Sequence, residues 1–136
     1  TNTNNMPTEK VLHKDLSYNI VGILYATHNE LGRYANEKQY GDLIENKLKQ
    51  CGIKYEREKV LDKYFSEEHP GRHRIDFLID DKIILELKCK RFIGKEEYYQ
   101  TQRYLHALDK KLGILVNFRT RFIQPRRVIN SAIRDL

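Results

Sequence analysis

The chain has 136 residues, of which 40% are hydrophobic and 32% charged, and this composition fits one globular domain rather than a disordered or fibrous chain. Its formal charge of +6 suits a polyanionic partner without identifying one. No apolar run approaches the roughly 18 residues of a membrane helix, so we expect no membrane contact. Two cysteines with neither disulfide nor zinc spacing favour a cytoplasmic location.

The N-terminal part begins with polar residues that show no pattern. We expect residues 1–13 to form a flexible tail and residues 14–136 to form one domain. Apolar side chains recur at helical spacing over residues 14–31, which predicts a helix. Gly32 offers the C-terminal stop of this helix.

A second helix is predicted from Glu37 to about Gln50, with Asn36 as its N-terminal cap. Glu37 lies in line with the apolar positions of this helix, so its carboxylate is expected on the buried face. A buried carboxylate needs a partner charge or a metal. The helix dipole alone also favours glutamate in a first turn. The apolar positions are Tyr40, Leu43, Ile44 and Leu48.

Two strands of a hairpin follow an extended stretch at residues 53–65 and a loop at 66–71. The strands are predicted at residues 73–79 and 82–89, joined by a tight turn. Their apolar alternation fixes the register, because a slip of one residue would separate every apolar pair. The predicted pairs are Ile75 with Leu87, Phe77 with Leu85, and Ile79 with Ile83.

The same register places Asp76 opposite Glu86, and Arg74 opposite Lys88. Two carboxylates that face each other across a ladder repel and destabilise the pairing. One interpretation is a surface charge ladder in which Arg74 and Lys88 neutralise the acids diagonally. The other is a divalent cation held between the carboxylates.

Lys88 follows Glu86 by two residues, so both side chains leave the same face of one strand, about 6–7 Å apart. A metal polarises water and stabilises negative charge on a phosphate, and an adjacent ammonium can orient that water. This grouping is typical of phosphodiester hydrolysis. Hard oxygen ligands favour Mg²⁺, with Mn²⁺ as a substitute, over zinc.

The C-terminal part contains a predicted helix at residues 95–111, with Gly113 as its stop, and an apolar strand at 113–118 that reads as buried on both faces. The remaining tail holds five arginines against one acid. The order helix, helix, strands, helix, strand indicates one α/β domain with a mixed central sheet flanked by helices.

Three segments of the chain resemble the GxxExxY proteins of the PD-(D/E)XK nuclease superfamily. They are ELGRYANEKQYGDLIENKLKQCGIKYERE at 30–58, RIDFLIDDKIILELK at 74–88 and YQTQRYLHALDKKLGILVNF at 99–118. The resemblance runs from about residue 14 to 129. One departure is that Tyr34 stands where the family motif begins with glycine, which leaves the entry to the second helix in question.

The resemblance implies the restriction-endonuclease-like fold and a catalytic set of Glu37, Asp76, Glu86, Lys88 and Gln100. Asp76 and Glu86 are implied to bind Mg²⁺, and Glu37 to complete the metal site directly or through water. Lys88 is implied to act as the catalytic lysine. Gln100 is implied to touch this lysine, a water or the substrate backbone.

The sequence therefore predicts a Mg²⁺-dependent nuclease whose substrate is nucleic acid, with DNA favoured over RNA. Basic residues beside the site and in the tail are candidates to contact the phosphate backbone: Lys90, Arg91, Arg119 and Arg121. A solvated basic tail is the alternative. A homodimer is one way for a domain of this size to embrace a duplex. Two other functions stay open: a non-catalytic nucleic-acid-binding module and a protein-interaction module that keeps the fold.

Overall fold

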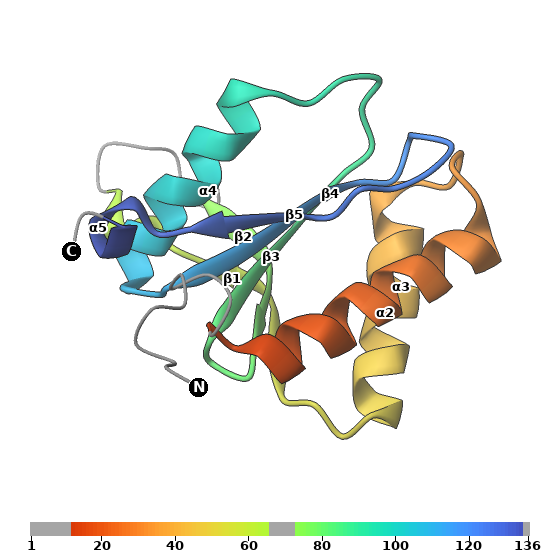
Figure 1. The fold of residues 1–136 in the computed structure, drawn as a ribbon, viewed down its shortest axis with the longest axis horizontal. Coiled ribbons are helices and arrows are strands. Elements are labelled where there is room, and N and C mark those ends of the chain that lie inside the picture. The colour runs from red at the N-terminus through yellow and green to blue at the C-terminus, as the bar shows by residue number, and fades with distance from the viewer. Residues whose placement is uncertain (1–11, 66–72, 135–136) are drawn as a thin grey trace, which may run out of the picture.

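The computed structural model describes residues 12–65 and 73–134. Five strands form one mixed sheet in the order β1-β2-β3-β4-β5, with helices on both faces (Figure 1). Neighbouring strands are antiparallel, except for the parallel pair β3 and β4. This is the α/β architecture expected from the sequence. The strands are β1 (Tyr55–Val60), β2 (Arg74–Ile79), β3 (Ile83–Lys88), β4 (Leu112–Asn117) and β5 (Arg126–Ile129).

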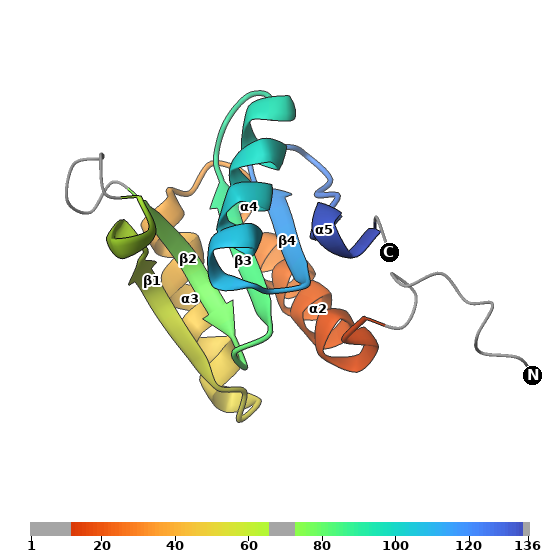
Figure 2. The same cartoon turned by 90° about the vertical axis from the view of Figure 1, so that its left-hand side faces the viewer.

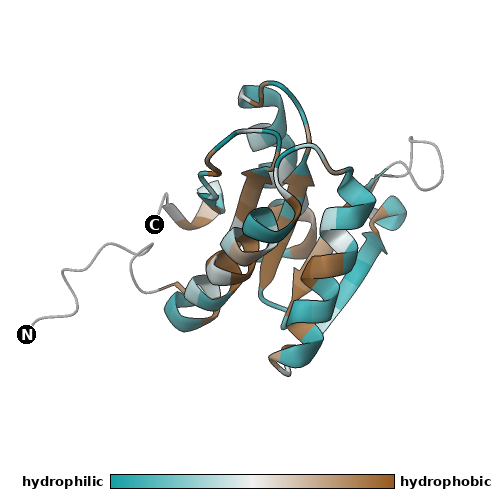
Figure 3. Ribbon diagram, turned by 90° about the vertical axis from the view of Figure 1, so that its right-hand side faces the viewer, coloured by the Kyte–Doolittle hydropathy of each residue, from teal (hydrophilic) through white to brown (hydrophobic). Residues whose placement is uncertain are grey.

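Helices α2 and α3 cover one face of the sheet and α4 covers the other (Figures 1 and 2). The central strands are mostly hydrophobic, whereas the helices in front of them mix polar and hydrophobic residues (Figure 3). In the described part of the chain, no helix has the length and apolar character required to cross a membrane. The helices are α2 (Lys14–Leu31), α3 (Glu37–Gln50), the 3-10 turn η2 (Asp62–Tyr64), α4 (Lys95–Leu108) and the short α5 (Ser131–Arg134).

Helix α4 forms the crossover between the parallel strands β3 and β4, a connection that parallel pairing requires. Strand β4 is buried at all six positions, as its apolar sequence predicts. The crossover brings the carboxyl ends of β3 and β4 to one edge of the sheet. Side chains at that edge therefore come from segments far apart in the sequence.

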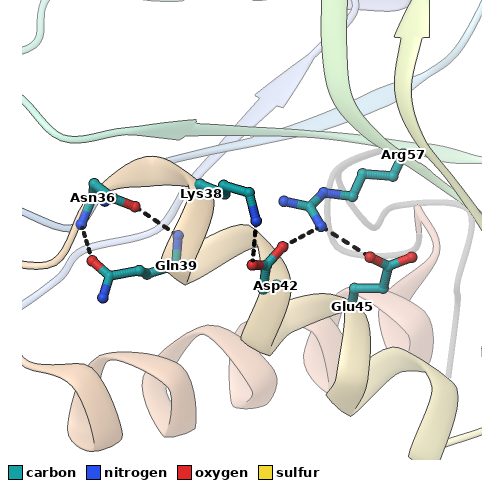
Figure 4. A network of polar contacts seen from close by, with 6 residues as sticks. All are labelled: Asn36, Lys38, Gln39, Asp42, Glu45 and Arg57. Carbon is teal, nitrogen blue, oxygen red and sulfur yellow. Dashed lines mark hydrogen bonds and ion pairs between the residues drawn. The ribbon is translucent and has the colours of Figure 1, made fainter.

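The start of α3 is capped as predicted. The side chain of Asn36 accepts a hydrogen bond from the backbone of Gln39 at 2.8 Å, and the side chain of Gln39 accepts one from the backbone of Asn36 at 2.9 Å (Figure 4). This reciprocal pair satisfies two backbone donors that the helix leaves without a partner. Gly32 ends α2 with φ 73°, a conformation that glycine adopts without strain.

The predicted hairpin register is confirmed for Phe77 with Leu85 and for Ile79 with Ile83. Asp80 and Asp81 make the turn with φ values of 51° and 56°. Two successive positive values are typical of the type I′ turn, whose twist matches that of a hairpin.

The structure also corrects the sequence-based elements. Helix α4 ends at Leu108 rather than residue 111, because Asp109 adopts a left-handed conformation as its cap. Gly113 lies inside β4 and is no helix stop. The basic tail contains β5 and α5, which the sequence did not predict.

The predicted N-terminal tail and loop fall largely outside the described residues. Residues 1–11 and the predicted loop at 66–71 cannot be compared with the structure. Leu12, which we assigned to the tail, is only 8% exposed and packs in the core between the sheet and the α2–α3 layer.

Gly113 allows α4 to approach β4 closely, because a Cβ at this position would lie 2.8 Å from the Thr101 methyl group. We expect Gly113→Ala to destabilise the protein by about 1–3 kcal/mol through overpacking, measured by urea denaturation. Gly22→Ala is the matched control, since no atom lies within 4 Å of its added Cβ. It should stabilise α2 by about 0.5–1 kcal/mol. A Gly113→Ala protein as stable as the wild type would contradict the packing argument.

Candidate active site

Asp76 and Glu86 lie where the ladder between β2 and β3 opens. The last ladder pair at this end is Phe77 with Leu85, and side chains replace backbone pairing beyond it. The Asp76 backbone N–H donates to Glu86 Oε2 at 2.9 Å, and the Leu87 N–H donates to Asp76 Oδ2 at 2.7 Å. The two predicted acids therefore meet, with each carboxylate held by a backbone donor of the opposite strand.

The neighbouring strand is irregular at the same level. The β1–β2 pairs on either side place Glu58 across from Asp76, and Glu58 has a φ of 53°. At this irregularity the alternation of β2 changes, so that Phe77 packs toward α2 and α3 while Ile75 packs toward α4. The prediction that Ile75 shares a face with Phe77 and Ile79 is wrong for this reason.

The opposition of Arg74 and Lys88 is also corrected. The ladder has ended before these positions, and Arg74 pairs instead with Val60 of β1. Its guanidinium donates to Glu58 Oε1 at 3.1 Å. Arg74 therefore neutralises Glu58 of β1.

Burial raises the pKa values of both acids. Glu86 is 3% exposed, and its burial and then the charge of Asp76 hold its pKa well above its usual range. Burial, with smaller contributions from Glu37 and Glu58, raises the pKa of Asp76 to about 6, although the bond from Leu87 opposes this rise. The ionised forms of two such neighbouring acids would be stabilised by a cation bound between them.

Lys88 lies on the side of the acid pair that faces α4. Its ammonium donates a long hydrogen bond of 3.5 Å to Gln100 Oε1. Its charge favours the ionised forms of both Asp76 and Glu86. A hollow of about 350 Å³ opens here, lined by Lys88, Gln100, Tyr99 and Arg103 among others.

Glu37 is exposed, which corrects the expectation of a buried carboxylate. The apolar face of α3 is buried as predicted at Tyr40, Ile44 and Leu48, but Glu37 stands in the first turn, where its side chain reaches open space. It lines a hollow of about 300 Å³ together with Asp76. The helix thus brings this acid to the mouth of the site rather than into the core.

Tyr40 fixes the first turn of α3. Its hydroxyl donates to the Gly32 carbonyl at 2.5 Å and accepts from the Ala35 N–H at 3.3 Å. Its ring stacks on Phe118 with the centroids 4.2 Å apart. Burial raises the pKa of this hydroxyl, so it stays a donor. The tyrosine of the E-x-x-Y motif thereby holds the turn that positions Glu37.

A second contact holds α3 against β1. The Arg57 guanidinium of β1 donates to Asp42 Oδ1 at 2.7 Å and to Glu45 Oε1 at 2.9 Å (Figure 4). Hydrogen bonds lower the pKa values of both acids, from Arg57 first for Asp42 and from Tyr55 first for Glu45. Gly41 leaves the space for Arg57, because a Cβ there would collide with the guanidinium.

The acids alone do not form a closed metal cage. Within residues 12–65 and 73–134, no group of three or more His, Cys, Asp or Glu side chains lies close enough together to hold a metal ion. Asp76 and Glu86 are the two acids of the site held by backbone hydrogen bonds. Glu37 and Glu58 line a hollow together with Asp76 from exposed positions.

The predicted basic residues surround the carboxyl ends of β3 and β4. Lys90 is exposed and forms an ion pair with Glu97 at 3.0 Å, whereas Arg91, Arg119 and Arg121 are exposed in loops. Other members of the basic tail have structural contacts. Phe118 is fully buried, and the Arg127 guanidinium donates to Ser17 Oγ and to the Leu12 carbonyl.

Comparison with known proteins agrees with this fold. A family model described as the PD-(D/E)XK nuclease superfamily matches residues 14–129. The chain belongs to the PD-(D/E)XK nuclease superfamily. No curated protein and no solved structure matches it.

For a PD-(D/E)XK chain, the sequence analysis missed Glu58 and the Arg57–Gly41 contact. Glu58 enters the site through the pairing of β1 on β2, and no pattern in the charged β1 sequence specifies that register. The contact at Gly41 did have a sequence signal, because this glycine lies inside a helix. Glycine inside a helix costs about 1 kcal/mol relative to alanine and often marks a close approach.

The raised pKa values of this PD-(D/E)XK site predict a pH-dependent stability. Because folding raises the pKa of Asp76 to about 6 and that of Glu86 further, the folded state binds protons more tightly than the unfolded chain. Their contribution to stability is complete below about pH 4 and is lost as the pH rises through 6. We therefore expect Glu86→Gln to stabilise the metal-free protein by about 1–3 kcal/mol at pH 7.5, with a smaller gain at pH 5.

Urea denaturation in EDTA from pH 5 to 8 measures this difference. Comparing the variant with the wild type cancels the acids whose pKa values are lowered, Asp42, Glu45 and Glu97. Glu56→Gln, at an exposed position of β1, is the control and should change stability little at any pH. A Glu86→Gln protein less stable than the wild type at pH 7.5 would contradict the argument that the buried Glu86 charge costs stability.

Proposed function

We propose that the protein is a divalent-metal-dependent nuclease that hydrolyses phosphodiester bonds in DNA. Its family membership indicates nuclease-type function. The observation that carries the finer proposal is the pair of half-buried Asp76 and buried Glu86 at the open end of the β2–β3 ladder. The placement of two mutually repelling carboxylates in the interior is costly unless a cation joins them.

Asp76 and Glu86 are the proposed metal ligands. The backbone hydrogen bonds use Oδ2 of Asp76 and Oε2 of Glu86, and the other oxygen of each carboxylate is proposed to bind the cation. Glu37 lines a hollow together with Asp76 and is proposed to assist metal binding, directly or through water. A purely oxygen donor set suits Mg²⁺, with Mn²⁺ as its substitute. When bound, the ion polarises water and offsets charge on the phosphate.

Lys88 is proposed to orient the attacking water and to stabilise the negative charge that develops on the phosphate. Its ammonium is beside Gln100 and close enough to both acids to influence their ionisation. Gln100 is proposed to restrain Lys88 from α4. This arrangement would place the ammonium between the acid pair and the hollow on the α4 side.

We assign the chain to the GxxExxY group within the superfamily on the basis of its E-x-x-Y motif. Tyr40 gives this motif a physical role, because its hydroxyl bridges the turn between α2 and α3. Tyr34, which replaces the leading glycine, is 73% exposed, so its side chain is accommodated without intruding on the acids.

Cleavage of labelled DNA in Mg²⁺ tests the proposed activity. We expect Lys88→Ala to lower the cleavage rate at least about 100-fold through the loss of transition-state stabilisation. Single-stranded, duplex and branched substrates should be compared. Lys82→Ala removes an exposed lysine at the opposite end of the hairpin and should cleave like the wild type. If wild type and Lys88→Ala bind DNA but are equally inert on all substrates, the chain is a binding module.

Calorimetry with Mn²⁺ tests the metal site without reference to activity. We expect saturable binding by the wild type and a loss of at least about tenfold in affinity for Asp76→Asn, which removes one charged ligand. Asp62→Asn is a control outside the acid pair. Absence of saturable binding by the wild type would favour a protein-interaction module in which the acids are structural.

A further inference from the structure

Three loops meet at the edge of the sheet where β3 and β4 end. They connect α2 to α3 (residues 32–36), β3 to α4 (89–94) and β4 to β5 (118–125), and Figure 1 shows them converging at one end of the fold. The side chain of Asn117 joins two of them, since it accepts from the Lys90 N–H at 3.0 Å and donates to the Lys90 carbonyl at 2.7 Å. His28 lies 3.0 Å from the carbonyl of Thr120 and so links the end of α2 to the third loop.

Positive charge is concentrated in these loops. Together they contain five Lys or Arg residues and no Asp or Glu, against a net charge of +6 for the entire chain. Within the part of the chain that the structure describes, no ion pair involves Arg33, Arg91, Arg119 or Arg121. Their charges are therefore available to an anionic partner.

Each loop also exposes one aromatic ring beside an arginine. The exposed fractions are 73% for Tyr34, 79% for Phe92 and 74% for Phe122. Arginine guanidinium carbons lie 4.9 to 5.7 Å from the three ring centroids. Exposed aromatic rings that are clustered, rather than scattered singly, mark an interaction surface.

The rings border two hollows of the same surface. One of about 450 Å³ is lined by Arg33, Tyr34, Arg91, Arg119 and Arg121, and so draws on all three loops. The other, of about 330 Å³, is lined by Phe92 and Phe122 among others. Thr120 and Arg91 line both, so the hollows adjoin.

We propose that this surface binds single-stranded DNA, with unpaired bases stacked on Tyr34, Phe92 and Phe122 and with the arginines on its phosphates. A duplex buries the faces of its bases, whereas a single strand offers them to aromatic side chains. Charge alone would suit either form of DNA. The exposed rings are the feature that favours the unpaired strand.

The surface would deliver that strand to the proposed catalytic centre. This role of the surface rests on the proposed function. Lys88 ends β3, and Arg91 and Phe92 follow within four residues. Tyr34 similarly precedes Glu37 by three residues. Two of the three loops thus connect a residue of the candidate site to the aromatic surface.

Fluorescence anisotropy in EDTA measures DNA binding without cleavage. The probes are a fluorescein-labelled oligo(dT) of about 15 nucleotides, within the usual footprint of such sites, and the dA·dT duplex of the same length. We expect replacement of Tyr34, Phe92 and Phe122 together by alanine to weaken oligo(dT) binding at least about 30-fold and duplex binding less than about twofold.

Two controls separate stacking from damage to the fold. Tyr18→Ala removes a ring of 78% exposure about 20 Å along α2 from the surface and should leave binding unchanged. Phe92→Tyr and Phe122→Tyr keep the rings and should retain affinity for oligo(dT). Thermal melting of each variant checks that the domain remains folded.

The stacking proposal would be overturned if the triple variant lost equal affinity for oligo(dT) and duplex, or lost affinity for neither. It would also be overturned if the wild type did not prefer oligo(dT) to the duplex. None of these results depends on metal binding or on Lys88. Cleavage with no preference for unpaired DNA would refute this surface and leave the nuclease standing. Preferential oligo(dT) binding without cleavage would support the surface and refute the nuclease.

Discussion

The fold is organised around one feature, in which two carboxylates, half-buried Asp76 and buried Glu86, replace backbone carbonyls as hydrogen-bond acceptors at the open end of a hairpin. Asp76 and Glu86 accept the N–H groups that would otherwise be left without partners where the β2–β3 ladder ends. This satisfies the backbone but places two acids beside each other away from water, and burial raises both pKa values, with the charge of Asp76 adding to the rise for Glu86. A local defect in pairing thereby becomes a site that attracts a cation, and the surrounding elements hold it open.

Helix α3 and helix α4 support this centre from opposite faces by different means. On one face, Tyr40 holds the turn before α3 and Arg57 ties the helix to β1, so that Glu37 is positioned by contacts outside the acid pair. On the other face, α4 provides Gln100 beside Lys88. Its close fit on β4 depends on Gly113, which has no side chain to separate the two layers.

Sequence periodicity was informative wherever local pattern and tertiary structure agree. The hairpin register, the cap at Asn36 and the meeting of Asp76 with Glu86 all follow from residues close together in the chain. The reversal of Ile75 and the approach of Glu58 were not predictable, because both depend on the irregular pairing of β1, a strand whose charged sequence carries no alternation.

Burial of Glu37 was mispredicted for a related physical reason. A helical-face argument assumes that a neighbouring layer covers every turn, whereas the first turn of α3 extends to the rim of the site. Strand β5 was missed because arginines conceal its apolar positions. Val128 and Ile129 are buried, but Arg126 and Arg127 precede them directly.

The contact of Arg127 with Ser17 and the Leu12 carbonyl has a consequence for handling the protein. It secures the entry to α2 beside β5, at the opposite end of the sheet from the loops that follow β3 and β4 (Figure 1). A fluorophore, affinity tag or surface tether joined ahead of Leu12 would consequently face away from those loops. Immobilisation through that end would orient the molecules with the loops that follow β3 and β4 toward the solution.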